Sequence, residues 1–487
     1  MAINAVIIIG WEPPSTRFRP FSISLPPPLF PIGGYPLIFH HIKALSNLSA
    51  DLKNVFLMGS YDEKKFRPFL DYARTMFNFK IHYLQEEIPN NSAGALFFFK
   101  EQIQVDQPKF LFVMHCDICS SFPLHEMLKA HQSRQDKEAT LLTVMCVNQP
   151  SRAARSEGFG RFIYDPKTWQ VLHFTDHAPT FSPNQATSCG IYLYTVAQLY
   201  TEPSYTDFSD KYARILSISK DDHQERSLAK YFNEFANQFK INTCTEQISM
   251  RDLLAPMSES RGRAHIYVID QQKHFWHQIQ KTKQLLSAQD TYLKYYQQVD
   301  RHILTQPSSI IPEDQIVGLV CIHPTAEVHP GARIGPNVTI GAHARVADGA
   351  RIINSIILED CVVQPHAVVI NSIIGWSSVI GSWTRVEGLL NKSDSTSPRN
   401  ATTKMMLGAS DDQSTMTQQL LEGEGDMEGF YHSITGKPTC QEIYRVLKNG
   451  VTTIGGGVFI EPELHLRNVV VLPFKRVNES SYHQIIV

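Results

Sequence analysis

The sequence predicts a Rossmann-like α/β domain, roughly residues 1–300, followed by a left-handed parallel β-helix built from hexapeptide repeats. Two observations predict this order. Short apolar strands alternate with helical patterns in the first half, and aliphatic residues recur every six positions in the second half. A chain of 487 residues is also too long for one ordinary hydrophobic core, so we expect two or more domains.

The first half begins with a continuous aliphatic run, 5–9, that ends at Gly10 and is typical of a buried parallel strand. Helical and strand patterns then alternate at 36–47, 53–58, 64–77, 81–84, 92–102 and 110–114. This alternation predicts βαβ units and a mostly parallel sheet. From 158 to 194 the sequence is richer in strand patterns, and 301–320 reads as a linker.

A six-residue aliphatic step marks the second half. It runs through three blocks: Ile322, Val328, Ile334, Ile340, Val346 and Ile352; then Ile356, Val362, Val368, Ile374, Ile380 and Val386; then Ile454, Ile460, Leu466 and Leu472. An α-helix does not explain this step, because six residues rotate a helical side chain by about 240°. We expect β-helix at 321–387 and 451–487. The Ser-, Gly- and Asp-rich stretch 388–450 is expected to be a flexible insertion, either solvated without a role or an arm to a partner.

Charge and composition exclude several classes of function. Lys and Arg number 45 against 47 Asp and Glu, so no basic footprint indicates binding to nucleic acid or to an anionic membrane. No apolar run reaches the roughly 18 residues of a membrane span, and the start of the chain does not resemble a signal peptide. The eight cysteines are scattered, which favours a reducing compartment. We therefore expect a cytoplasmic protein.

The loop after the first strand is where a doubly wound sheet binds a nucleotide. It reads Gly10-Trp-Glu-Pro-Pro-Ser-Thr-Arg-Phe-Arg-Pro20 and is followed by Pro28-Leu-Phe-Pro31. Further motifs are His40-His-Ile42, Ile322-His-Pro-Thr-Ala326, Ile374-Gly-Trp376, Arg385-Val-Glu-Gly388 and Gln484-Ile-Ile486.

These motifs resemble the nucleoside-diphosphate-sugar pyrophosphorylases, a nucleotidyltransferase family with the signature Gly-Gly, a spacer, Gly-Thr-Arg and Pro-Lys-Pro. Within that family the chain is most similar to the alpha subunits of GDP-mannose pyrophosphorylase (mannose-1-phosphate guanylyltransferase), whose longer spacer matches residues 12–14. The resemblance covers nearly the whole chain, apart from 388–450 and about 200–260.

The resemblance implies attack of a sugar 1-phosphate on the α-phosphorus of GTP, with release of pyrophosphate. Such chemistry needs a glycine loop at the phosphates, cationic side chains, and carboxylates that hold Mg²⁺. Arg17 stands at the family's catalytic arginine and Asp117 at its first metal carboxylate, which makes Asp117 a weak candidate for Mg²⁺. Two null alternatives remain: Arg17 braces its loop, or Asp117 caps a following helix.

Other positions depart from the active pattern. Two family glycines are replaced, by Trp11 and Ser15, and the lysine of Pro-Lys-Pro is Pro27. The second metal carboxylate is Gln278, and the sugar-phosphate lysine is His177. The resemblance therefore implies a catalytically impaired site, in which any bound Mg²⁺ is doubtful.

Binding of GDP-mannose, which carries two phosphates and demands fewer cations, is still expected. The residues that match nucleotide- or sugar-binding positions are Gly10, Arg17, Gln85, Gly94, Asp117, Gly160, Asp176 and Gly190. The resemblance implies a catalytic GDP-mannose pyrophosphorylase beta subunit as partner, feedback inhibition as outcome, and self-association through the β-helix. An active guanylyltransferase and a scaffold that binds no ligand remain as alternatives.

Overall fold

The computed structural model describes residues 2–10, 18–48, 51–86, 91–135, 140–148, 159–175, 184–200, 263–305, 315–389 and 450–487. The chain divides into two compact units. The first comprises Met1–Phe18 and Ser22–Lys281, and the second comprises Arg19–Phe21 and Thr282–Val487. Arg17, Asp176, His177 and the body of the predicted insertion lie outside the described residues. Within the described ranges, no helix is long and apolar enough to cross a membrane.

The first unit is built on a nine-stranded mixed sheet in the order β10-β9-β11-β6-β1-β4-β5, with β8 beside β11 and β12 beside β8. Its strands are β1 (Ile3–Gly10), β4 (Leu52–Gly59), β5 (Lys80–Gln85), β6 (Phe110–His115), β8 (Leu142–Val147), β9 (Arg161–Tyr164), β10 (Val171–Thr175), β11 (Gln185–Thr195) and β12 (Ala264–Val268). Strands β5, β4, β1 and β6 are parallel, as the βαβ pattern predicts, and β11 runs antiparallel to β6.

Helices cover this sheet on both faces, and each face has its own hydrophobic core. The helices are α1 (Leu37–Ser46), α2 (Glu63–Met76), α3 (Asn91–Phe98), α4 (Lys100–Ile103), α5 (Leu124–Gln135) and α6 (Val196–Leu199). The single helix expected at 92–102 is interrupted at Phe99, whose ψ of 19° leaves the helical range. Phe97 and Phe99 are both buried. In a continuous helix, two residues that are two positions apart point to nearly opposite faces. The interruption therefore lets both Phe97 and Phe99 reach the core.

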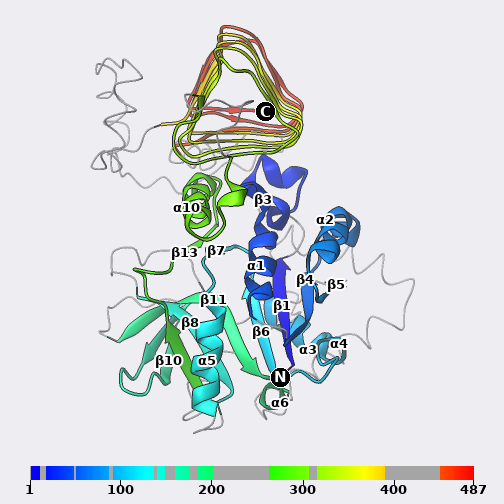
Figure 1. Cartoon of the computed structure of the whole chain (residues 1–487), viewed down its shortest axis with the longest axis vertical. Coiled ribbons are helices and arrows are strands. Elements are labelled where there is room, and N and C mark those ends of the chain that lie inside the picture. The colour runs from blue at the N-terminus through cyan, green and yellow to red at the C-terminus, as the bar shows by residue number, and fades with distance from the viewer. Residues whose placement is uncertain are drawn as a thin grey trace, which may run out of the picture. The chain divides into compact units, whose positions relative to one another are not determined.

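The second unit contains three parallel sheets of short strands that coil around one core (Figure 1). The first sheet holds β14 (Val320–Ile322), β17 (Val338–Ile340), β20 (Ser355–Ile357), β23 (Ser372–Ile374), β26 (Thr452–Ile454), β29 (Val470–Val471) and β32 (Ile485–Ile486). The second holds β15 (Glu327–Val328), β18 (Arg345–Val346), β21 (Val362–Val363), β24 (Val379–Ile380), β27 (Phe459–Ile460) and β30 (Arg476–Val477). The third holds β16 (Arg333–Ile334), β19 (Arg351–Ile353), β22 (Val368–Ile370), β25 (Arg385–Glu387), β28 (His465–Arg467) and β31 (Ser481–Tyr482). The predicted fold class, an α/β nucleotidyltransferase sheet followed by a β-helix, is confirmed.

The inward column differs from the predicted phase in the first half of the second block of repeats and agrees with it again at Ile374, Ile380 and Val386. At the end of the third block, Val471 and not Leu472 is inward. Ile340 stacks on Ile357, not on Ile356, and the buried core continues through Val363 and Val369. Later coils are one residue shorter than three hexapeptides, and the shortening falls at a corner occupied by Asn337, Asn354 and Asn371, each 17 residues from the next. These asparagines have positive φ, and along the stack the side chain of Asn337 donates to Asn354 Oδ1 and that of Asn354 donates to Asn371 Oδ1. Asparagine tolerates this left-handed backbone. The step between inward residues is five at Asn354 (Ile352 to Ile357) and at Asn371 (Val369 to Ile374), whereas it is six at Asn337.

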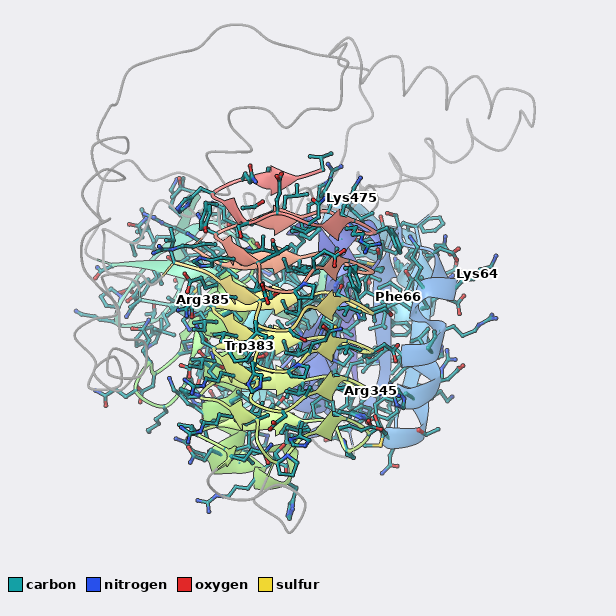
Figure 2. All side chains as sticks on the ribbon, turned by 90° about the horizontal axis from the view of Figure 1, so that it is seen from above. Lys64, Phe66, Arg345, Trp383, Arg385 and Lys475 are labelled. Atoms are coloured by element: carbon teal, nitrogen blue, oxygen red, sulfur yellow. The ribbon has the colours of Figure 1, made fainter. Side chains whose placement is uncertain are left out.

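The coils continue across the insertion. Strand β23 pairs in register with β26, and β25 pairs with β28, so residues 450–487 stack directly on residues before 388. Figure 2 shows the coils stacked from the side, with Arg345, Trp383 and Arg385 on their outer surface. Helix α10 (Lys283–Val299) also belongs to this unit: Gln289 Nε2 donates to the Asn337 carbonyl at 3.0 Å.

Candidate functional site

Several predicted binding residues lie along one edge of the first unit's sheet. Gly10 ends β1 and Gln85 ends β5, and both pair with Gly59 at the end of the strand between them. Asp117 follows the end of β6, and Gly190 lies in β11 next to Ile191, which pairs with Met114 of β6. This edge is formed by the carboxyl ends of the parallel strands, where open α/β sheets bind their ligands.

The backbone at the start of the phosphate loop is tightly fixed. Gly10 has φ of +91°, a conformation that side chains rarely adopt, although an added Cβ would meet nothing closer than 3.9 Å. At Gly59 an added Cβ would lie 2.2 Å from the Gly10 carbonyl oxygen. That oxygen accepts a hydrogen bond from the Ser60 amide at 3.1 Å. Two glycines are therefore required here, one for its φ and one for close approach of the strands.

Asp117 is held by a short two-stranded sheet formed from distant parts of the chain. Strand β7 (Ile118–Ser120) pairs antiparallel with β13 (Trp276–Gln278), which sets Gln278 opposite Ile118. Gln278 Nε2 donates to Asp117 Oδ2 at 2.8 Å, and the Ile279 amide donates to the Asp117 carbonyl at 2.7 Å. Helix α5 begins only at Leu124, so the alternative in which Asp117 caps this helix is wrong.

The donor set around Asp117 fits Mg²⁺ poorly. Mg²⁺ takes oxygen ligands, above all carboxylates, and it demands near-octahedral geometry. One oxygen of Asp117 accepts the Gln278 N–H group, and the amide oxygen of Gln278 accepts Nε2 of Gln280 at 3.0 Å. Among the described residues, no group of three or more His, Cys, Asp or Glu side chains is placed to hold a metal ion. We therefore derive no catalytic step through Mg²⁺.

Aromatic rings pack over two of the predicted glycines. Gly190 has φ of +70°, and an added Cβ there would lie 2.6 Å from the Phe159 ring. The centroid of that ring is 4.5 Å from the centroid of the His115 ring, at the end of β6. Gly160 has φ of +82°, and its added Cβ would lie 2.5 Å from the Phe174 ring. Both glycines therefore lie under aromatic rings that a larger residue would displace.

His115 is a site residue that the sequence analysis missed. Its Nε2 is buried and has no hydrogen-bond partner among the described residues. Burial lowers the pKa of His115 to about 4, so the ring is neutral at pH 7. The carbonyl of His115 contacts Nε2 of His41 at 3.1 Å. Its position two residues before the predicted Asp117 was the available signal.

The remaining predicted residues are placed as follows. Gly94 is buried in α3, and the Gln85 side chain is exposed. Pro27 begins a short 3-10 helix, Pro27–Leu29, where its missing N–H group costs no hydrogen bond. The hydroxyl of Ser188 accepts a hydrogen bond from the Gly190 amide at 3.2 Å. The binding roles of these residues stay predictions.

Comparisons with known proteins cover both units. The nucleotidyl transferase family matches residues 6–294, and the GMPPB C-terminal domain family matches residues 316–487. Over 486 residues, 100% of each chain, this chain is 33% identical to mannose-1-phosphate guanylyltransferase regulatory subunit alpha-B of Danio rerio. It is 34% identical over 486 residues, again 100% of each chain, to the regulatory subunit alpha of Homo sapiens. A probable mannose-1-phosphate guanyltransferase of Schizosaccharomyces pombe is 32% identical over 489 residues, with the same coverage.

Proposed function

The chain belongs to the family of the mannose-1-phosphate guanylyltransferase regulatory subunits alpha, and from this membership we propose that it binds GDP-mannose without synthesising it and thereby regulates a catalytic partner. The hydrogen bond between Gln278 and Asp117 is the observation that carries this proposal. In place of the two carboxylates that the family resemblance implies around a metal ion, the site has one carboxylate, which accepts a hydrogen bond from an amide at 2.8 Å.

The loss of catalysis follows from charge. Pro27 removes a cation that would stabilise the reacting phosphates, and Gln278 removes a metal ligand. The loss of one well-placed charge-stabilising group typically costs about 10²–10³ in rate. Losses within one site do not add in a simple way, but one or two such factors leave little turnover. Trp11 and Ser15 further replace glycines whose backbone would approach a triphosphate.

Ligand binding has weaker requirements than catalysis. The carboxyl edge of the sheet retains glycines at positions 10, 160 and 190, all with positive φ. The half-buried ring of Phe159 lies over Gly190, and such a ring suits the nonpolar face of a pyranose. A diphosphate-linked sugar needs fewer cations than GTP together with a sugar 1-phosphate. The edge therefore supports binding of a product rather than its synthesis.

The proposed partner is the catalytic GDP-mannose pyrophosphorylase beta subunit, and the proposed outcome is feedback inhibition by GDP-mannose. The word "regulatory" in the relatives' names supports a catalytic partner. Exposed β-helix faces support self-association as a further part of this proposal, because flat sheet faces bury area efficiently against one another.

A pyrophosphate-release assay tests the proposal. The chain alone, with GTP, mannose 1-phosphate and Mg²⁺, should turn over far below the usual range of about 1–10³ s⁻¹. When it is added to the catalytic subunit, GDP-mannose should lower the rate further than it does with the catalytic subunit alone. UDP-glucose at the same concentration serves as the control nucleotide-sugar.

Two outcomes would contradict the proposal in different ways. Turnover by the chain alone within the usual range would make it an active guanylyltransferase. A complex whose rate shows no added dependence on GDP-mannose would leave only a scaffold.

A further inference from the structure

The outer face of the third β-helix sheet is rich in arginine. Each strand of this sheet pairs in parallel register with the next, so the outward residues of successive coils form two columns. We call this surface the arginine face. Its first column is Arg333, Arg351, Val368, Arg385 and His465, and its second is Ile353, Ile370, Glu387, Arg467 and Tyr482. The arginine face thus holds four arginines and one carboxylate.

Two arginines at one end of this face have no counter-charge. Arg333 pairs in register with Arg351, and neighbouring strands of a sheet lie only about 4.8 Å apart. Both side chains are exposed, and within the described part of the chain neither has an ion-pair or hydrogen-bond partner. Like charges at directly paired positions destabilise a sheet. A bound anion would remove this repulsion.

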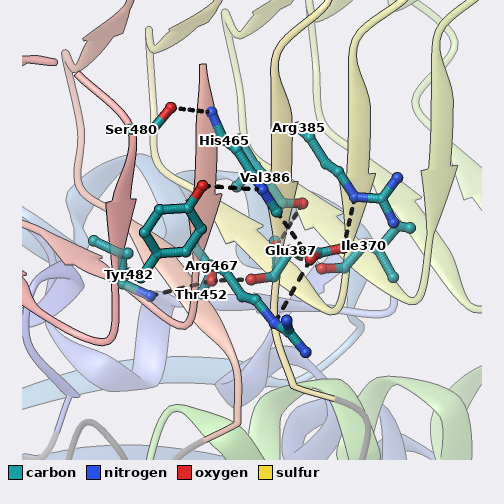
Figure 3. A network of polar contacts seen from close by, with 11 residues as sticks. Ile370, Arg385, Val386, Glu387, Thr452, His465, Arg467, Ser480 and Tyr482 are labelled. Carbon is teal, nitrogen blue, oxygen red and sulfur yellow. Dashed lines mark hydrogen bonds and ion pairs between the residues drawn. The ribbon is translucent and has the colours of Figure 1, made fainter. Parts of the chain in front are cut away.

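Glu387 does not neutralise the rest of the face. Its carboxylate, only 14% exposed, is shared by Arg385, His465 and Arg467 (Figure 3). Arg385 and Arg467 remain 38% and 43% exposed. The whole chain has 45 Lys and Arg against 47 Asp and Glu, so the excess of positive charge is local to this face. The arginine face therefore suits an acidic occupant.

The insertion supplies an acidic sequence within the same chain. Carboxylates alternate with smaller or apolar residues at Glu422, Glu424, Asp426 and Glu428, which we call the acidic stretch. No Lys or Arg occurs in 405–436, and the stretch lies outside the described residues. In an extended chain, residues two positions apart point to the same side, about 7 Å from one another. Such a sequence can present its carboxylates as one row.

The insertion leaves the β-helix beside the arginine face. Gly388 directly follows β25, whose Arg385 belongs to that face. Arg333 lies three strands from Arg385 in the same sheet, a distance of about 14 Å. Residues 390–421 and 429–449 connect the acidic stretch to the β-helix, and a flexible chain of about 20 residues spans about 25 Å. The connection is long enough, and a tether of this kind gives effective concentrations in the millimolar range.

We propose that the acidic stretch docks on the arginine face of its own chain, where its carboxylates meet Arg333, Arg351 and the neighbouring Arg385. Guanidinium and carboxylate groups form short, often bidentate pairs. Each exposed pair is weak by itself, so the contact depends on the row of pairs and on the tether, and it is sensitive to salt. A second arginine face is a poor occupant, because arginines would meet arginines.

The test measures how fast phenylglyoxal modifies individual arginines of the full-length chain at low salt, with the modified peptides quantified by mass spectrometry. The quadruple variant converts the acidic stretch to amides: Glu422→Gln, Glu424→Gln, Asp426→Asn and Glu428→Gln. The matched control, Asp411→Asn with Asp412→Asn, removes charge from the same insertion outside the stretch. Arg345 is the internal reference, because it lies on the second sheet and is 68% exposed. Thermal melts verify that both variants are folded.

We expect Arg333 and Arg351 to react at least fivefold faster in the quadruple variant than in the unmodified chain, and less than twofold faster in the control. The rate at Arg345 should change less than twofold throughout. In about 0.5 M NaCl the unmodified chain should reach the rates of the quadruple variant, because screening then acts within a few ångströms.

Four results would overturn the proposal. They are equal rates in the unmodified chain and the quadruple variant, equal acceleration by both variants, equal acceleration at Arg345, and protection that disappears when the unmodified chain is diluted 100-fold. The second and third would indicate a general effect of charge, and the fourth a contact between copies. GDP-mannose is absent from this experiment, so its outcome is independent of the function proposed above.

Discussion

Replacing Glu387 with glutamine should loosen the coils that follow the insertion. Glu387 is the last residue of β25, and its side chain is only 14% exposed. Its carboxylate accepts Arg385 Nε at 2.7 Å and contacts His465 Nε2 at 2.9 Å and Arg467 Nε at 3.7 Å (Figure 3). The cluster thus joins a coil before the insertion to a coil after it. Burial alone would raise the pKa of Glu387, but the hydrogen bonds from Arg385 and His465 outweigh burial and lower it.

The expected magnitude follows from the charge of Glu387. Hydrogen bonds to a charged group contribute about 1.5–3 kcal/mol each, against about 0.5–1.5 for neutral pairs. Because the three partner side chains are 33–43% exposed, we discount the loss for Glu387→Gln to about 1–2 kcal/mol. Local opening should then rise by about 5- to 30-fold.

Hydrogen exchange followed by mass spectrometry measures this opening. Peptides from 452–486 should exchange faster in Glu387→Gln, while peptides from 320–386 should be unchanged. Glu327→Gln is the matched control, because Glu327 pairs with Arg345 at 3.4 Å on the same β-helix but is 75% exposed. Equal acceleration in both regions, or none, would refute the reasoning. The Glu387 contribution exists above the ordinary glutamate pKa and is lost as pH falls through the lowered one.

Three further predictions concern the first unit. Gln278→Asp should lower Tm in EDTA, because the new carboxylate would face that of Asp117. Millimolar Mg²⁺ should restore the Tm of this variant. A Tm that does not respond to Mg²⁺ would contradict the prediction. Gly190→Ala should lower the free energy of unfolding, measured with urea, by about 2–3 kcal/mol. The control Gly456→Ala, whose Cβ would meet nothing closer than 3.5 Å, should lower it by less than about 1 kcal/mol. Equal losses in the two variants would contradict the packing argument. Burial keeps four histidines neutral and lowers their pKa values to about 3 or 4. They are His40, His41, His115 and His131. The free energy of unfolding should therefore fall as pH drops from 6.5 to 4, by up to about 1.4 kcal/mol per pH unit for each histidine. Urea midpoints that do not change over this pH range would contradict this prediction.

The β-helix shows what periodicity can predict and where it fails. The six-residue step indicates the coils and their continuation after the insertion. It gives the wrong phase from Ile356 to Val368, because Ile356 and Ile357 are neighbouring aliphatic residues and both are fully buried, and it is right again from Ile374. A pattern of apolar residues separates inside from outside only where one side faces water. The shortened corner depends on the Asn337 ladder, which becomes apparent only when successive coils are stacked.

The candidate site was predictable as a set of positions but not as an arrangement. Strand ends place Gly10, Gln85 and Asp117 on one edge, which follows from the parallel topology alone. The bond between Gln278 and Asp117 depends on pairing of β7 with β13 across 161 residues, and no local signal encodes that pairing. The ring of Phe159 over Gly190 is likewise a tertiary contact. Such contacts decide whether a site with recognisable motifs retains its chemistry.

Calorimetric titration of GDP-mannose into the isolated chain, once in EDTA and once in Mg²⁺, tests the central claim most directly. We predict saturable binding at one site, with dissociation constants that agree within threefold in the two buffers, since Asp117 accepts a hydrogen bond from Gln278 and, among the described residues, no group of three or more acidic, His or Cys side chains is placed to hold a metal ion. Absence of saturable heat, or binding that occurs only with Mg²⁺ present, would contradict the account.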